Sequence, residues 1–169
     1  MIQTTTVATV DFHQSEYSQI TTDYDEAYQL YWCYMHAQPR ACFTKTMLRE
    51  LNHCFHTLKN NPEALDERPI RYMVLASKIP GIYNLGGDLN LFRELITTHD
   101  REGLLHYATT CIDALYAKMT IYEKGMVHIT LVQGDALGGG MECALSSDVL
   151  IAEHSARMGM PEILLVSVR

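Results

Sequence analysis

Short runs of apolar residues, five to seven positions long and bounded by polar or glycine-rich stretches, recur along the chain. Such runs are typical of strands that are buried on both faces of a sheet. An aromatic-rich segment at 28–35 predicts a further strand, because aromatic side chains suit a pleated surface and Pro39 then ends the run. The predicted buried strands cover residues 71–77, 126–132 and 148–152.

Between these strands the apolar residues are spaced three and four positions apart, which predicts amphipathic helices. Thr44 can cap the first helix, and Pro62 follows its end. The predicted helices cover residues 45–60, 89–96, 103–122 and 141–146. The broad apolar face of the long third helix consists of Leu104, Tyr107, Ala108, Cys111, Ile112, Leu115 and Met119. Alternating strands and helices predict an α/β domain with helices packed on the faces of the sheet.

The start of the chain differs in composition from the rest. Residues 1–24 are rich in Thr, Ser, Gln and Asp and have weak periodicity, so we interpret them as an extended arm with room for one short element. Residues 25–169 then form a single core domain, which fits a length of 169 residues.

Charge and hydropathy exclude several classes of function. Thirteen Lys and Arg against twenty Asp and Glu give a net charge of −7, and an acidic chain without a basic run argues against general nucleic-acid binding. No apolar stretch reaches the roughly 18 residues of a membrane span, and the N-terminus lacks the charged and apolar parts of a signal peptide. A soluble, cytoplasmic protein is expected.

The cysteines and histidines do not form a metal-binding pattern. The five cysteines are odd in number and no two are spaced C-x-x-C, which favours buried thiols in a reducing compartment. His53 and His56 share one face of a predicted helix, but Cys54 does not point with them, so an exposed helix face is a better interpretation than a metal site.

Two loops, at 79–88 and 134–140, share one design: an apolar strand, adjacent glycines, then a helix. Adjacent glycines let backbone N–H groups approach a ligand, so each loop can hold a phosphate or a developing oxyanion. The second loop lacks both the Gly-Lys-Ser/Thr ending of a P-loop and G-x-G-x-x-G spacing, since position 136 is Ala, and the chain has no G-x-S-x-G elbow. A phosphate- or nucleotide-binding module is therefore disfavoured.

Two glutamates accompany these loops. Glu142 lies one turn into the helix that follows the second loop, and Glu162 follows Pro161 in a glycine-containing bend. Most glutamates are solvated surface charges, and the spacing alone does not pair these two.

Together these segments resemble the signature block of the crotonase (enoyl-CoA hydratase/isomerase) superfamily. The segment 83–89 resembles the first oxyanion loop of that superfamily, and 39–44 resembles its early strand-to-helix turn. The resemblance runs from about residue 28 to 165 and implies a ClpP/crotonase fold, an α/β superhelix of ββα units with helices packed on the sheets. The signature block covers residues 132–142, 147–153 and 156–162.

Within the superfamily the chain is most similar to the diffusible-signal-factor synthases, on segments 84–89, 106–116 and 134–140. These bacterial enzymes make cis-2-unsaturated fatty-acid messengers for quorum sensing. The resemblance implies dehydration of a 3-hydroxyacyl thioester on acyl carrier protein, followed by hydrolysis of the thioester. No cofactor is implied beyond the carrier, which is acyl carrier protein or CoA.

The resemblance assigns functional roles to individual positions of this sequence. Gly87 and Gly139 match the two N–H donors of the oxyanion hole, and Glu142 and Glu162, twenty positions apart, match the catalytic carboxylates. The resemblance implies Glu162 as base and Glu142 as partner acid or water-holder, with the reverse assignment also open. The positions expected to contact the substrate are Leu85, Gly86 and Gly138.

Asp88 is expected to cap the following helix rather than to take part in the chemistry. No metal site is expected.

Two alternatives remain at this point. An ordinary enoyl-CoA hydratase or isomerase would use the same residues. A short crotonase fold without activity could instead bind a partner, for example the receiver domain of a sensor kinase.

Crotonase-like chains continue into helices that cover the acyl pocket and help to build trimers, whereas residues 165–169 depart from that continuation. We therefore expect a core that is incomplete at its C-terminus, and a homotrimer only for the complete chain.

Overall fold

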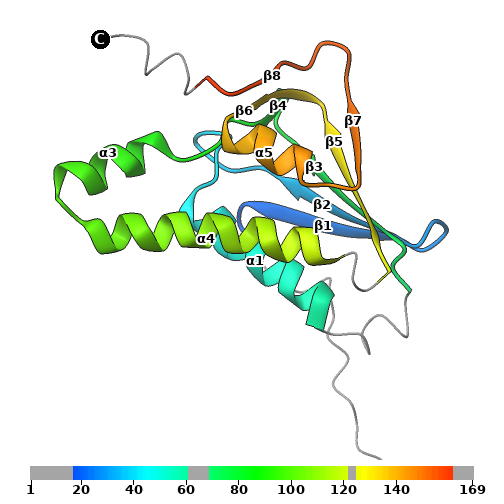
Figure 1. Ribbon diagram of the computed structural model, residues 1–169. Helices are drawn as coiled ribbons and strands as arrows, with labels where there is room; N and C mark the ends of the chain where they lie inside the picture. The colour runs from blue at the N-terminus through cyan, green and yellow to red at the C-terminus, as the bar shows by residue number, and fades with distance from the viewer. Residues whose placement is uncertain (1–16, 61–68, 122–124, 162–169) are drawn as a thin grey trace, which may run out of the picture.

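A computed structural model describes residues 17–60, 69–121 and 125–161, which form two sheets with helices packed against them (Figure 1). The larger sheet has the order β1-β2-β3-β5-β7. The first pair, β1 and β2, is antiparallel and the other pairs are parallel. Its strands are β1 (Ile20–Asp25), β2 (Leu30–Met35), β3 (Tyr72–Ser77), β5 (Val127–Val132) and β7 (Val149–Ala152).

The smaller sheet is parallel and has the order β4-β6-β8. Its strands are β4 (Gly81–Asn84), β6 (Gly134–Leu137) and β8 (Met158–Gly159). Each of the consecutive pairs β3-β4, β5-β6 and β7-β8 therefore places one strand in each sheet. The first two pairs are followed by a helix, and this repeat is the ββα superhelix expected from the resemblance.

Four helices lie among the described residues: α1 (Lys45–Asn60), α3 (Leu89–Thr97), α4 (Arg101–Met119) and α5 (Gly139–Leu145). The hydroxyl of Thr44 accepts a hydrogen bond from the Met47 N–H, which confirms the predicted cap of α1. Met47, Leu51, Phe55 and Leu58 of α1 are all buried in the hydrophobic core. Figure 1 shows α1 and α4 side by side below the sheets, with α5 above α4.

The structure corrects three predictions. Strand β1 begins inside the segment interpreted as an arm, and Ile20 is 1% exposed, so the core starts before residue 25. Strands β4 and β6 lie within segments predicted as loops, because their glycines hid the strand pattern. A methyl group on Gly134 would overlap the carbonyl of Gly81, so this strand pair requires glycine at that position.

The third correction concerns the predicted apolar face of α4. Ile112 and Met119 are 63% and 52% exposed, respectively. The side chains that this helix buries are those of Tyr107, Ala114, Ala117 and Lys118. The buried face of α4 is thus shifted from the predicted one and includes a lysine.

Candidate active site

The register of β4 against β6 brings the two glycine loops to equivalent positions. Asn84 pairs with Ala136 at the ends of these strands, and three further residues along each chain lead to Gly87 and Gly139. Six positions separate Gly81 from Gly87 but only five separate Gly134 from Gly139, and the β-bulge between Ile82 and Asn84 absorbs the extra residue. Gly87 and Gly139 therefore start from the same edge of the small sheet.

The loops approach so closely that Gly86 has no space for a side chain. Its φ is +85°, and a Cβ there would lie 2.9 Å from both the Gly139 nitrogen and the Leu137 oxygen. A Cβ built on Gly139 would lie 3.8 Å from the Gly87 nitrogen and 3.9 Å from Glu142 Oε2. Gly87, Gly139 and Glu142 are thus gathered within a few ångströms.

The glycines differ in what their N–H groups do. Gly86 N–H donates to the Oδ1 of buried Asn84 at 2.8 Å, and Gly138 N–H donates to the Gly159 carbonyl at 2.8 Å. The Gly87 and Gly139 N–H groups have no acceptor among the described residues. The first pair of N–H groups therefore shapes the loops, while the second pair is available to a ligand oxygen.

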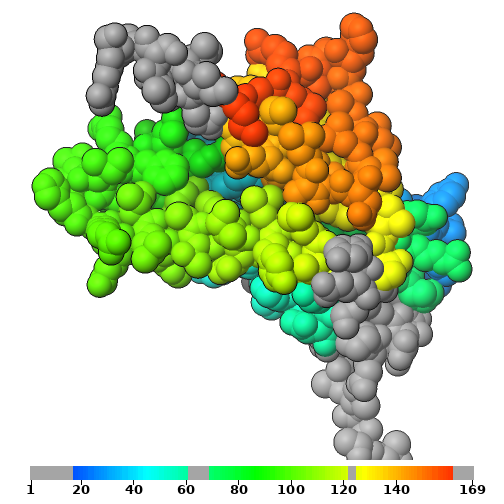
Figure 2. All heavy atoms as spheres, viewed as in Figure 1, coloured from blue at the N-terminus to red at the C-terminus, as the bar shows by residue number. Residues whose placement is uncertain are grey.

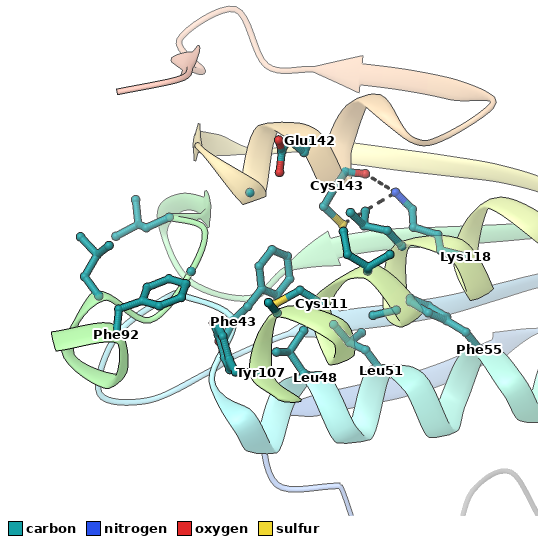
Figure 3. A pocket seen from close by; sticks show the side chains of 18 of the residues that line it. Phe43, Leu48, Leu51, Phe55, Phe92, Tyr107, Cys111, Lys118, Glu142 and Cys143 are labelled. Atoms are coloured by element: carbon teal, nitrogen blue, oxygen red, sulfur yellow. Dashed lines mark hydrogen bonds between the residues drawn. The ribbon is translucent and has the colours of Figure 1, made fainter. Parts of the chain in front are cut away.

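A cavity of about 480 Å³ opens at these two glycines (Figure 3). Figure 2 shows the surface hollowed between α3–α4 and α5. Carbon-rich side chains from α1, α3 and α4 form most of its wall, and Glu142 and Lys118 are its charged lining residues. Its apolar wall is formed by Phe43, Leu48, Leu51, Phe55, Leu85, Leu89, Phe92, Tyr107, Ala108, Cys111, Ile112, Ala114, Leu115, Cys143 and Pro161.

The loop that carries Gly87 is held from three sides. Asp88 caps α3 by accepting hydrogen bonds from the Asn90 and Leu91 N–H groups, which confirms its predicted role. Its carboxylate also pairs with Arg40 at 2.5 Å. On the inner side, the Tyr107 hydroxyl donates to the Phe43 carbonyl at 2.5 Å and accepts from the Asp88 N–H at 2.9 Å. Gly87 itself forms a parallel bridge with Phe43.

Glu142 occupies the first turn of α5 and is exposed at the mouth of the cavity (Figure 3). Cys111 faces it from α4, and burial, followed by the negative charge of Glu142, raises the pKa of this thiol. Pro161 is the last described residue and lines the same cavity. Glu162 lies outside the described residues, so its predicted pairing with Glu142 stays a prediction.

The other expected substrate contacts are near the cavity. Leu85 is 39% exposed and lines the cavity, and its contact with substrate stays a prediction. Gly86 and Gly138 lie in the two loops, with their N–H groups bonded within the protein as described above.

Lys118 is a polar lining residue that is not among the residues predicted for the site. It is 1% exposed and reaches from α4 to the Cys143 carbonyl at the end of α5. A sequence signal existed, since Lys118 follows Tyr107, Cys111 and Ala114 at helical spacing and so occupies a core position.

Further features of the described residues concern thiols, metal ligands and membrane-spanning helices. All five cysteines are free thiols, and four of them are buried. Over the described residues no group of three or more His, Cys, Asp and Glu side chains could hold a metal ion. Within the same residues no helix is long and apolar enough to cross a bilayer.

Comparisons with known proteins agree with this geometry. The profile of the family described as "Enoyl-CoA hydratase/isomerase" matches residues 34–168. The probable mitochondrial enoyl-CoA hydratase 2 of Arabidopsis thaliana is 30% identical over 120 residues, which are 70% of this chain and 35% of that protein. The short-chain-enoyl-CoA hydratase of Clostridium acetobutylicum is 29% identical over 117 residues, or 69% of this chain and 40% of that protein.

Among solved structures, Pseudomonas aeruginosa DspI superposes with a TM-score of 0.74 at 24% identity, over 90% of this chain and 53% of that one. The chain thus spans 35–40% of the two curated relatives and about half of this solved structure. The structural likeness shows the crotonase fold, and the family profile covers the whole segment that builds the cavity. The chain therefore belongs to the enoyl-CoA hydratase/isomerase family.

Proposed function

We propose that this chain carries the oxyanion hole of an enzyme that moves protons at C2 and C3 of a fatty-acyl thioester. One observation supports this most directly: the N–H groups of Gly87 and Gly139, which have no acceptor in the described part of the chain, lie beside the Glu142 carboxylate at the mouth of an apolar cavity. A thioester carbonyl placed there would receive two hydrogen bonds, and its acyl chain would enter the cavity. Such donors stabilise the enolate oxygen that forms when C2 loses a proton.

The specific reaction we propose is dehydration of a 3-hydroxyacyl group carried on acyl carrier protein. A glutamate removes the C2 proton, the C2–H electron pair becomes the C2–C3 double bond, and the C3–O bond breaks. The second glutamate, protonated, donates its proton to the departing hydroxyl, which leaves as water. Two carboxylates at one apolar cavity suit this exchange, because their repulsion separates their pKa values.

A second step would release the messenger. Water activated by a glutamate attacks the thioester carbonyl, and the same two N–H groups stabilise the tetrahedral oxyanion. The C–S bond then breaks, and the carrier leaves as a thiol after taking up a proton. The product would be a free cis-2-unsaturated fatty acid, the diffusible quorum-sensing signal implied by the sequence resemblance.

Hydration of enoyl-CoA is the second candidate. It is supported by the names of the curated relatives, which include an enoyl-CoA hydratase and a short-chain-enoyl-CoA hydratase. The two candidates use the same site and differ in the carrier and in whether the thioester survives.

Substrate competition separates them. The chain is given a 3-hydroxyacyl group on acyl carrier protein or on CoA, and enoyl product and free acid are measured by mass spectrometry. Preference for acyl carrier protein with release of acid supports the synthase. Preference for CoA without release of acid supports the hydratase. Turnover of neither supports a non-catalytic binding role, for which capture of a receiver domain is the direct assay.

Glu142→Gln tests the shared chemistry, because it keeps the shape of the side chain and removes its charge. We expect kcat to fall by about 10²–10⁴, the usual contribution of a positioned acid or base. Glu162→Gln is expected to do the same. Glu94→Gln, on the exposed face of α3, is the matched control. Full dehydration activity in either of the first two variants would rule out the paired-glutamate mechanism.

A further inference from the structure

We propose that Lys118 is a positioning residue for the oxyanion hole, acting through α5. The proposal rests on the proposed function, since it assigns Lys118 a part in that same site. It concerns how the helix that carries Gly139 and Glu142 is held in place.

The ammonium of Lys118 meets the far end of α5. Its Nζ donates to the Cys143 carbonyl, to Ser146 Oγ at 3.0 Å and to Thr130 Oγ1 at 3.4 Å. An ammonium has three N–H donors, so the three oxygen acceptors can use all of them, and Cys143 Sγ at 3.8 Å is a fourth, weaker acceptor. Figure 3 shows the Lys118 side chain along the cavity wall, with its nitrogen turned towards α5 and not into the cavity. Lys118 is therefore not placed to bind substrate itself.

The other end of α5 is fixed by packing. A Cβ on Gly140 would overlap the carbonyl of Asn84, so the first turn of the helix lies directly against the end of β4. A helix of only seven residues is oriented by its two ends. Lys118 supplies the second fixed point, because its ammonium binds the Cys143 carbonyl in the last turn of α5, where Ser146 Oγ also donates to the same carbonyl at 2.8 Å. Glu142 lies between these two fixed points, and Gly139 directly precedes the first of them.

A lysine is an unexpected choice for this position if packing alone were needed. Lys118 is 1% exposed, and it forms no ion pair with a carboxylate among the described residues. Burial lowers the pKa of this amine, while Cys143 and Asp148 act in the opposite direction. Burying a charged group costs free energy unless good hydrogen bonds compensate for it, so an apolar side chain would fill this space at a lower cost. The polar contacts of Lys118 therefore make better sense as control of position than as a source of stability.

The test compares Lys118→Met with Lys59→Met. Lys59 is the matched control because it also donates to a threonine hydroxyl, Thr120 Oγ1 at 2.8 Å, but does not line the cavity. We expect Lys118→Met to lower kcat about 10- to 100-fold with KM changed less than about threefold, since a misplacement of 1 Å can cost about 10² in rate. Lys59→Met should keep kcat within about twofold of the parent. Equal effects of the two substitutions, or an unchanged kcat in Lys118→Met, would overturn the proposal.

A spectroscopic readout keeps this test separate from the proposed function. A cinnamoyl-CoA thioester absorbs further to the red when its carbonyl accepts strong hydrogen bonds, whether or not it is turned over. If the parent chain turns over neither thioester carrier, the proposed function fails. The Lys118 proposal then still predicts a red shift in the parent and in Lys59→Met, and a smaller shift in Lys118→Met at saturating probe. The same red shift in all three, or none in the parent, would refute it.

A second variant covers poor folding of Lys118→Met. Ser146→Ala keeps the lysine and removes one of its acceptors at the C-cap of α5. We expect a smaller fall in kcat, about three- to tenfold, with far-ultraviolet circular dichroism like that of the parent. An unchanged kcat and an unchanged red shift in Ser146→Ala would count against positioning through this end of the helix.

Discussion

The hydroxyl of Tyr107 accepts a 2.9 Å hydrogen bond from the amide N–H of Asp88, the residue directly after the predicted oxyanion donor Gly87. The same hydroxyl donates to the carbonyl of Phe43. A side chain from the middle of α4 thus ties together two loops that are 45 positions apart in the sequence. Tyr107 is 2% exposed, and burial, the largest cause, raises its pKa well above the usual value, so it remains a neutral donor and acceptor.

Tyr107→Phe should loosen the first loop. The substitution leaves the Asp88 N–H and the Phe43 carbonyl without their buried partner, and we expect a loss of about 1–3 kcal/mol in the free energy of unfolding. Urea denaturation measures this loss, and kcat should fall as well because Gly87 is adjacent. Tyr116→Phe on the exposed side of α4 is the control, expected within about 0.5 kcal/mol of the parent. Equal stability of the two variants would contradict this role for Tyr107.

Gly86→Ala should abolish activity by forcing the two loops apart. The new methyl group would meet backbone atoms of Leu137 and Gly139 at 2.9 Å, and backbone atoms cannot move aside as a side chain can. Gly81→Ala is the matched control, because its φ of +70° imposes a similar backbone strain with no atom within 4 Å of the added methyl group. Both variants should lose about 1 kcal/mol from the left-handed backbone, and only Gly86→Ala should lose turnover. Retained activity in Gly86→Ala would show that the observed loop spacing is not required.

His128→Leu should stabilise the protein. His128 lies in β5, is 2% exposed, and neither ring nitrogen has a partner among the described residues. Leucine would remove this unsatisfied polar group, with an expected gain of about 1–3 kcal/mol at pH 7. Thermal or urea unfolding measures the gain. A loss of stability would indicate that the imidazole is bonded in solution.

The same histidine should make the free energy of unfolding depend on pH. Burial, and then the charge of Lys118, lowers the pKa of His128 to about 2 from 6.5. Between these two values the unfolded chain binds a proton that the folded chain does not, so this group destabilises the fold as the pH falls below 6.5. From pH 7 to pH 5 its contribution is about 2 kcal/mol. The parent should lose this much more than His128→Leu over that interval, and parallel losses in the two proteins would refute the assignment.

Glu50→Gln should release β1 from α1. The Glu50 carboxylate accepts hydrogen bonds from the Ser18 N–H and hydroxyl and from the Gln19 and Ile20 N–H groups, at 2.8–3.2 Å. Burial alone would raise the pKa of this carboxyl, but these hydrogen bonds lower it overall. Its stabilisation is therefore present above pH 4.5 and is lost as the pH falls through the lowered value.

The expected cost of Glu50→Gln is about 2 kcal/mol at pH 7, from weaker hydrogen bonds to a neutral acceptor. Amide hydrogen exchange in Ile20–Asp25 should accelerate more than exchange in β3. Glu102→Gln on α4 is the control. Unchanged protection of β1 would show that the cross-strand pairing with β2 suffices to hold it.

The sequence predicted most of the larger sheet because its strands are continuous apolar runs, and it predicted α1 with the observed bounds. It missed β4 and β6 because four-residue strands that begin at glycine show no apolar pattern. The family resemblance indicates the site glycines. Counting residues from the start of each strand would pair the wrong two glycines across β4 and β6. Without the bulge after Ile82, Gly139 would stand opposite Gly86 and not Gly87. Lys118 was missed because a lysine within a helical apolar pattern is usually assigned to the surface.

The bulge after Ile82 determines which glycine of the first loop stands opposite Gly139. Gly87 and Gly139, the two predicted donors, lie at matching points of successive repeats, so their separation depends on the spacing of neighbouring strands, about 4.8 Å in any sheet. Substitutions at loop positions with free space around them would then be tolerated while the pairing of β4 and β6 holds, whereas one inserted or deleted residue in either strand would move Gly87 and Gly139 out of alignment without disturbing the larger sheet.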